Sequence, residues 1–346
     1  MIDVAIALVP VVVFLAALFL MDTFRLVRPS WIVAALAYGA LAALASGALN
    51  DWLGQPGRVS PVVLSRYLAP VTEESVKALL LIAMVATARV GFLVDAAVLG
   101  FAVGAGFALV ENLEYLGSLK DVNATVWFVR GLGTAVLQGA TTSILAMIAK
   151  TGADRPRGGF VPACLIGWAA AVAIHSLFNH RILPPVAQTL VLLVTLPLAM
   201  LSVFERSERA TREWVGAGLD LDVELLALIG SEHFAATHFG RYLQRLRERL
   251  PGTVVADMFC LLRLELELSV QAKAMLLARE AGMDVPVDED LAASVAERDY
   301  LERSIGRAGL LALQPLQVTG RRDRWHRHVL GQRRATRSRG TSTSSG

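Results

Sequence analysis

Much of the first 204 residues consists of apolar runs that are each about as long as a lipid bilayer is thick. A helix needs ~20 mostly apolar residues to cross the hydrocarbon core, where its backbone polar groups must pair with one another. Seven such runs are present, at 2–21, 32–49, 62–88, 92–115, 125–149, 160–180 and 182–204. They predict an all-α protein, a multi-pass transmembrane helical bundle of about seven spans with the lipid bilayer as its solvent.

Charged residues divide the chain into two parts. Residues 1–204 hold 12 Lys and Arg and 10 Asp and Glu, whereas residues 205–346 hold 21 and 20. Amphipathic runs that predict helices recur in the second part, at 231–250, 254–280 and 291–305. Residues 321–346 carry eight Arg against one Asp, a composition that predicts a disordered basic tail. We therefore expect a membrane core at 1–204, a helical domain at 205–320 and a tail at 321–346.

The basic residues between the runs orient the chain. Loops on one side carry most of the Lys and Arg, and such residues concentrate on the cytoplasmic side of a membrane. The first run has Asp3 at its start and Arg25 and Arg28 after it, the reverse of a cleaved signal peptide. We expect an uncleaved first span, an N-terminus outside and a cytoplasmic C-terminal region. Nucleic acid is not an expected partner.

Three charged residues stand close together within the third run, which also holds Arg66 near its start. Glu73 and Glu74 are adjacent, and Lys77 follows them at i+4 and i+3, one helical turn away. A charge at bilayer depth costs about 3 kcal/mol or more on insertion scales unless it is paired or wetted. These residues are therefore candidates for a functional site in which Lys77 neutralises the carboxylate pair. A structural ion pair that locks helix packing is the alternative.

Polar residues also occur in three later runs, near the end of two of them and near the middle of the third. Counting at about 1.5 Å per residue places Glu74, Glu111, Gln138 and His175 roughly 18–24 Å from the cytoplasmic ends of their helices. All four then lie in the outer half of a core about 30 Å thick. This common depth predicts that four helices bring these side chains to one level.

Such a cluster would be suited to the activation of water. A Glu in a low-dielectric setting is a candidate general base, and His175 is a candidate proton donor. Asn112, next to Glu111, and Asn179, one turn after His175, are candidate hydrogen-bond donors to a developing oxyanion. Alternatively, Glu74 and His175 would hold a zinc-like divalent metal with an open position for water. The residues leave both possibilities open.

Three motifs on separate runs carry a family resemblance. They are Glu-Glu-Ser-Val-Lys (73–77), Phe-Ala-Leu-Val-Glu-Asn (107–112) and His-Ser-Leu-Phe-Asn (175–179). In this order they resemble the PrsW family of glutamic-type intramembrane proteases, related to CAAX prenyl endopeptidases and bacteriocin-processing proteins. The resemblance covers roughly residues 20–204 and implies a bacterial-type inner membrane and a membrane-anchored protein as substrate. It also implies that the catalytic or metal-coordinating groups are Glu73, Glu74, Glu111 and His175.

One position departs from the family pattern. The family has a His within a stretch resembling Gly-Thr-Ala-Val-Leu-His-Gly, and this chain has Gly-Thr-Ala-Val-Leu-Gln-Gly at 133–139, with Gln138 in its place. A Gln is neither an acid nor a base near neutral pH, and its amide is a poor ligand for zinc. The resemblance predicts an intramembrane peptidase, with a non-catalytic membrane scaffold or pseudoprotease as the alternative. An ion or proton transporter built on the buried Glu, His and Lys is a further alternative.

Overall fold

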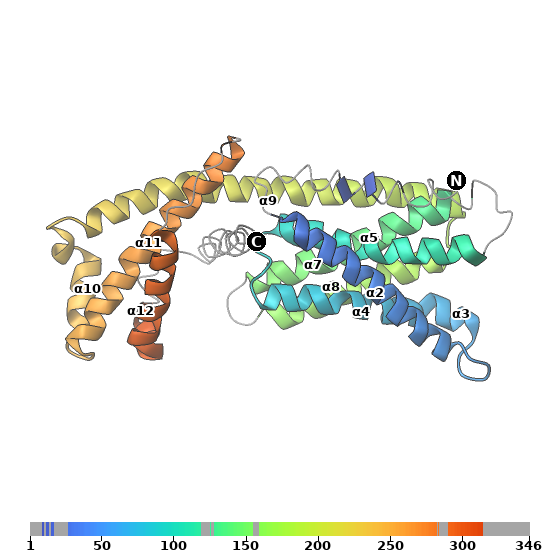
Figure 1. Ribbon diagram of the computed structural model, residues 1–346, viewed down its shortest axis with the longest axis horizontal. Helices are drawn as coiled ribbons and strands as arrows, with labels where there is room; N and C mark the ends of the chain where they lie inside the picture. Colours follow the sequence, from blue (N-terminus) through green and yellow to red (C-terminus); the bar gives the residue numbers. More distant parts are fainter. Residues whose placement is uncertain are drawn as a thin grey trace, which may run out of the picture. The chain divides into compact units, whose positions relative to one another are not determined.

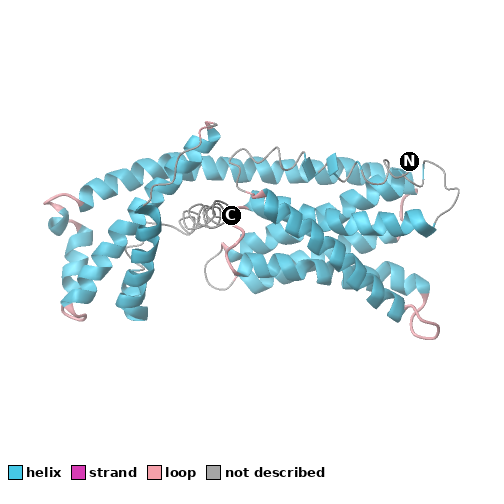
Figure 2. Ribbon diagram, in the orientation of Figure 1, coloured by secondary structure: helices cyan, strands magenta, loops and turns pink. Residues whose placement is uncertain are grey.

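A computed structural model of the chain describes residues 27–118, 125, 128–154, 159–281, 283 and 290–313, together with 9, 12–13 and 15–16. Every element within these residues is a helix, and no strand is present among them (Figures 1 and 2). The predicted all-α class is therefore confirmed. Packing divides the chain into two compact units, of which the first is Met1–Glu208 and the second Arg209–Gly346.

Five of the described helices are long and apolar enough to cross a membrane, and each overlaps a predicted run. They are α2 (Pro29–Leu53), α5 (Leu93–Ser118), α7 (Ala135–Ala153), α8 (Phe160–Asn179) and α9 (Pro185–Ile229). The predicted run 2–21 lies almost entirely outside the described residues, and the tail 321–346 lies wholly outside them. The count of seven spans therefore stays a prediction.

The last predicted run ends at residue 204, within a helix that extends beyond it. α9 continues to Ile229. Residues 205–215 are rich in Glu and Arg and contain no proline, so they favour helix as strongly as the apolar residues before them. Hydropathy changes at residue 204, but helix propensity does not. The predicted cytoplasmic location of residues 205–320 stays a prediction.

The third predicted run, 62–88, forms three consecutive helical segments. α3 (Pro61–Val63) leads into a π-helical segment, η1 (Leu64–Leu68), and α4 (Ala69–Ala86) follows. Pro70 lies in the first turn of α4 and has no N–H to donate to a carbonyl in the preceding turn. A wide π turn just before a proline is one way for a helix to accommodate that missing bond. α4 carries three charged residues and is not among the five candidate spans.

In the first unit, α5 packs against both α2 and α7. Two glycines of α5 make this close packing possible. A Cβ atom on Gly104 would lie 2.1 Å from the carbonyl oxygen of Gln138, and one on Gly106 would lie 2.0 Å from that of Leu36. No side chain fits at such distances, so backbones approach directly, as in small-residue interfaces of membrane helices. This approach brings Gln138 of α7 next to the helix that carries Glu111.

Hydrogen bonds from two neighbouring helices hold α4 in place. The Tyr38 hydroxyl of α2 donates to the carbonyl of Val76 at 2.6 Å. The Trp168 indole of α8 donates to the hydroxyl of Ser75 at 3.0 Å. Because both partners are in the turn that carries Glu73 and Glu74, these bonds fix the depth and rotation of the carboxylates.

The outer faces of the bundle are apolar. α2 exposes Val33 and Leu41, and α8 exposes Val161 and Leu165. A soluble protein rarely leaves large contiguous apolar patches facing water, whereas lipid chains are a favourable environment for them. The first unit therefore belongs in a membrane.

The second unit is a separate helical cluster. It contains the end of α9, the short η3 (Phe234–Ala236) and α10 (His238–Leu246), followed by α11 (Gly252–Glu280) and α12 (Asp290–Leu313). Its core includes the buried side chains Ile229, Leu262 and Leu266. α11 and α12 confirm the helices expected at 254–280 and 291–305, whereas the stretch 231–250 is helical only in part.

Candidate active site

Glu73 and Glu74 lie in different environments. The Glu74 side chain is fully buried, whereas 15% of the Glu73 side chain is exposed. Consecutive residues of a helix point about 100° apart, so the two carboxylates cannot share one direction. Glu74 faces the bundle interior and Glu73 faces its edge.

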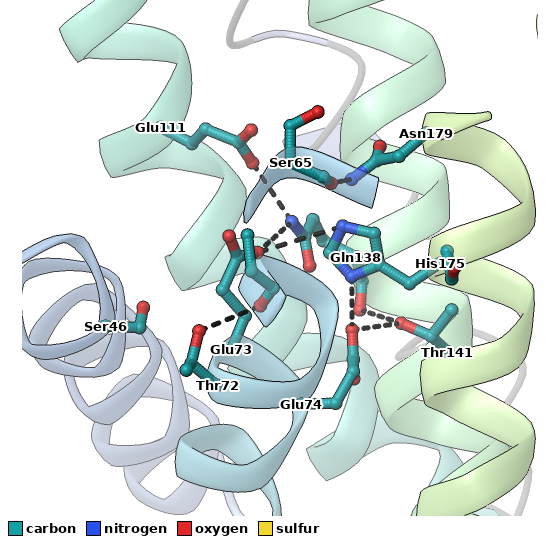
Figure 3. Close-up of polar contacts among 12 residues, drawn as sticks. Ser46, Ser65, Thr72, Glu73, Glu74, Glu111, Gln138, Thr141, His175 and Asn179 are labelled. Atoms are coloured by element: carbon teal, nitrogen blue, oxygen red, sulfur yellow. Dashed lines mark hydrogen bonds and ion pairs between the residues drawn. The ribbon is translucent and has the colours of Figure 1, made fainter. Parts of the chain in front are cut away.

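Glu74 is fixed by three hydrogen bonds to one oxygen. Its Oε1 accepts from the Lys77 ammonium at 2.6 Å, from His175 Nδ1 at 2.8 Å and from the Thr141 hydroxyl at 3.2 Å (Figure 3). An ionised carboxylate has no hydrogen to donate, so the proton of this imidazole is assigned to Nδ1. Within the described residues, Glu74 Oε2 is buried and has no hydrogen-bond partner.

His175 on α8 lies between the two carboxylates. With Nδ1 bonded to Glu74, its lone pair is on Nε2, which lies 3.8 Å from Oε2 of Glu73 (Figure 3). This distance is too long for a direct hydrogen bond and suits a bridging water. Glu74 therefore orients the imidazole, and Glu73 faces its reactive nitrogen.

Gln138 on α7 joins the remaining carboxylates. Its Nε2 donates to Oε2 of Glu73 at 3.3 Å and to Oε2 of Glu111 at 3.0 Å. Its Oε1 accepts from the Lys77 ammonium. Gln138 is fully buried, so these bonds form away from bulk water. The structure thus brings Glu111 of α5, Gln138 and His175 to the level of the α4 carboxylates, as the depth count predicts.

Lys77 pairs with Glu74 rather than with both carboxylates of α4. Besides Glu74 and Gln138, its ammonium lies 4.7 Å from the centre of the Phe107 ring, within the range of a cation–π contact. The side chain is fully buried. A buried cation with these partners offsets the charge of Glu74, and removing it would leave that charge uncompensated.

The two asparagines contact backbone carbonyls. Asn179 Nδ2 donates to the carbonyl of Ser65 in η1 at 2.9 Å, and the Ser176 hydroxyl donates to that of Arg66 at 2.6 Å. These carbonyls precede Pro70 by five and four residues, and an ordinary residue at position 70 would donate its N–H to one of them. Asn179 thus holds α8 to η1 and lies apart from the carboxylates. The buried Asn112 donates to Gly131, at the entry to α7, at 3.5 Å.

Two further residues of the cluster are not among those selected from the sequence. Thr141 donates to Glu74, and Asn50 of α2 donates to Oε1 of Glu73 at 3.4 Å. Thr141 lies three residues after Gln138, so helical spacing places it on the same face. Asn50 stands in the last turn of α2, directly after the apolar run 32–49, and a single amide at that position could have been selected from the sequence.

The donor atoms do not match a metal site. Glu73 Oε2 and His175 Nε2 face one another, but within the described residues no group of three or more His, Cys, Asp or Glu is arranged to hold a metal ion. Glu74 and His175, the predicted ligand pair, are bonded to each other through Oε1 and Nδ1. Gln138 turns its amide nitrogen, which cannot ligate a cation, toward Glu73 and Glu111.

Comparison with known proteins identifies the family. The model of the PrsW family intramembrane metalloproteases matches residues 27–204, which is more than half of the chain. The matched range includes α2 through the membrane part of α9 and every residue of the cluster. No curated protein and no solved structure matches the chain. The chain belongs to the PrsW family of intramembrane metalloproteases, and it is by family a membrane peptidase.

Proposed function

We propose that the chain hydrolyses a peptide bond of a membrane-anchored protein, using water held between Glu73 and His175. One observation carries this proposal: the buried Glu74 clamps Nδ1 of His175 and so directs Nε2 toward Glu73, across 3.8 Å. A general base needs a fixed orientation and access to water. Glu73 is partly exposed, and Glu74 is not.

In the reaction, the two side chains act on opposite hydrogens of one water. Glu73 removes a proton as the water oxygen bonds to the carbonyl carbon of the substrate. His175 accepts a hydrogen bond from the same water at Nε2 and sets its direction of attack. The carbon–nitrogen bond then breaks, and the proton held by Glu73 passes to the leaving amine. Glu74, Lys77 and Thr141 act as positioning residues. Glu74 contacts His175, and Lys77 and Thr141 contact Glu74, so none of the three acts on the water directly.

The other selected residues support the frame. Asn179 and Asn112 each donate to a backbone carbonyl of a π-helical segment, η1 or η2 (Phe128–Thr134), that leads into α4 or α7. Glu111 and Gln138 extend the hydrogen-bonded cluster beyond Glu73. The family suggests a bacterial-type inner membrane. The basic residues of the loops favour an N-terminus outside and residues 205–346 in the cytoplasm.

A non-catalytic scaffold that binds a membrane protein is the second candidate. It is favoured by Gln138, whose amide engages both Glu73 and Glu111 where a family His would stand. In that case Glu73 is held as a structural acceptor and is not available to water. The two candidates differ in one observable, which is cleavage.

The test uses the full chain in liposomes with a panel of single-span reporter proteins whose juxtamembrane segments vary. Mass spectrometry of the products records cleavage. We expect the wild type to cut at least one reporter and His175→Ala to lose ~10²–10⁴-fold in rate, the usual contribution of a positioned acid–base group. Wild-type rates in the double variant Glu73→Gln/Glu74→Gln would refute the site. If the wild type cuts no reporter, the scaffold is the correct candidate.

A further inference from the structure

The cluster holds more negative than positive charge. Glu73, Glu74 and Glu111 supply three carboxylates, and Lys77 is the lysine among them, at 2.6 Å from Glu74. A bound divalent cation is one way in which a protein interior offsets such an excess. The family description, metalloprotease, points in the same direction. In this chain, the position between two of the carboxylates is taken by a protein group.

That group is the side-chain amide of Gln138. Its NH₂ has two hydrogens, and both have an acceptor: Oε2 of Glu73 at 3.3 Å and Oε2 of Glu111 at 3.0 Å. A metal–carboxylate bond is about 2 Å long, whereas these spacings are those of hydrogen bonds. The carboxylates are therefore arranged around a hydrogen-bond donor.

The orientation of the amide follows from its neighbours. If the amide were turned over, its NH₂ group would face the Lys77 ammonium and its oxygen would face Glu73 and Glu111. Donor would then meet donor, and acceptor would meet acceptor. In the observed orientation, Oε1 accepts from Lys77 and Nε2 donates to the carboxylates. The oxygen, which is the only atom of the amide able to bind a cation, is directed at a fixed positive charge.

We infer that this chain, unlike a metalloprotease, works without a metal ion, because the Gln138 amide and the Lys77 ammonium together take the place of one. Gln138 is then a positioning residue that holds Glu73 beside Nε2 of His175. The inference rests on the same site as the proposed function, but it concerns whether a metal ion occupies that site rather than whether the chain cleaves a substrate. The identity of residue 138 decides which kind of site forms.

Metal content tests the inference without reference to activity. The full chain is purified in detergent without chelator, its metals are measured by mass spectrometry, and zinc is titrated calorimetrically. We expect substoichiometric metal in the wild type. We expect Gln138→His to bind zinc ~100-fold or more tightly than the wild type, since it adds an imidazole beside Glu73, Glu111 and His175.

Gln188→His is the matched control. Gln188 lies on α9 in the same unit, and its amide donates to the carbonyl of Phe178 rather than to a carboxylate. The same substitution there should leave zinc affinity unchanged. Equal gains in both variants, or no gain in Gln138→His, would overturn the inference. So would one metal per wild-type chain that is lost in Glu73→Gln, a measurement that stands even where Gln138→His does not fold.

A chelator separates this inference from the proposed function. Wild-type cleavage that is unchanged in 1,10-phenanthroline supports both. Cleavage that the chelator abolishes and zinc restores overturns the metal-free site and leaves the peptidase intact. A wild type that binds no metal and cuts no reporter supports the inference and contradicts the peptidase.

Discussion

Both units of the chain bury a lysine against a carboxylate at the same distance. Lys77 Nζ lies 2.6 Å from Glu74 in the first unit, and Lys273 Nζ lies 2.6 Å from Asp222 in the second. All four side chains are almost inaccessible. By distance and burial, the two pairs are equivalent.

Their surroundings differ. The oxygen of Glu74 that meets Lys77 also accepts from Thr141 and from His175, whose other nitrogen faces Glu73. Around Lys273, the adjoining turns of α11 bury small and apolar side chains, Ala272 and Leu276. A buried ion pair alone is weak evidence for a site, because such pairs also serve packing. The titratable groups beside the Lys77–Glu74 pair are the reason why we propose the reaction in the first unit.

The largest expected effect comes from removing either lysine. Lys77→Met and Lys273→Met each leave a buried carboxylate without its cation, which should cost ~3–5 kcal/mol in opening free energy. Hydrogen exchange measured by mass spectrometry in nanodiscs reads α4 and α11 separately. We expect each substitution to reduce protection in its own unit.

Replacing both members of each ion pair with apolar residues should have different results in the two units. Lys273→Met/Asp222→Leu eliminates both charges and should recover most of the lost protection. Lys77→Met/Glu74→Leu should not, because Thr141 and His175 also lose their shared acceptor. Equal recovery in the two units would mean that the Lys77–Glu74 pair is a packing device like the other.

The next largest effect is expected when one glycine in each unit is replaced by alanine. Gly104→Ala places a Cβ 2.1 Å from the Gln138 carbonyl oxygen and should cost ~1–3 kcal/mol by forcing α5 away from α7. Gly216→Ala, in the second unit, meets nothing within 4 Å and should stabilise α9 by up to ~1 kcal/mol. Thermal unfolding in detergent measures both. A neutral Gly104→Ala would contradict the close helix packing beside Gln138.

Two hydroxyls give the smallest expected difference. Thr141→Val removes a hydrogen bond to Glu74 and should cost ~1 kcal/mol, with slower cleavage because His175 is held less firmly. Within the described residues, the buried Ser269 hydroxyl of α11 has no hydrogen-bond partner, so Ser269→Ala should be neutral or slightly stabilising. If Ser269→Ala cost as much as Thr141→Val, a buried hydroxyl would matter equally in both units.

Apolar length and depth predict the helices and the level of the site. Counting residues along each run is enough to bring Glu111, Gln138 and His175 to the depth of Glu74, because helix rise is nearly constant. The contrast between charged and apolar residues likewise separates the apolar first unit from the more charged second unit. These features depend on local sequence alone.

The sequence does not reveal how each helix is rotated about its own axis. Residues of α5 that face α2 or α7 are as apolar as residues of α2 that face lipid, so hydropathy does not distinguish the two. Which glutamate meets His175 therefore had no signal in the sequence. The same holds for Asn179, whose bond to Ser65 depends on the carbonyl that Pro70 leaves without a donor. Only the packed helices show both.

The rate at which Glu73→Gln cleaves a membrane-anchored reporter in liposomes tests the central claim most directly. The substitution keeps the size of the side chain and removes the base, so the account predicts a fall of ~100-fold or more with an unchanged unfolding temperature. Glu114→Gln, the same change on an exposed residue of α5, serves as the matched control and should cleave at the wild-type rate. Cleavage by Glu73→Gln at the rate of this control would contradict the assignment of Glu73 as the base.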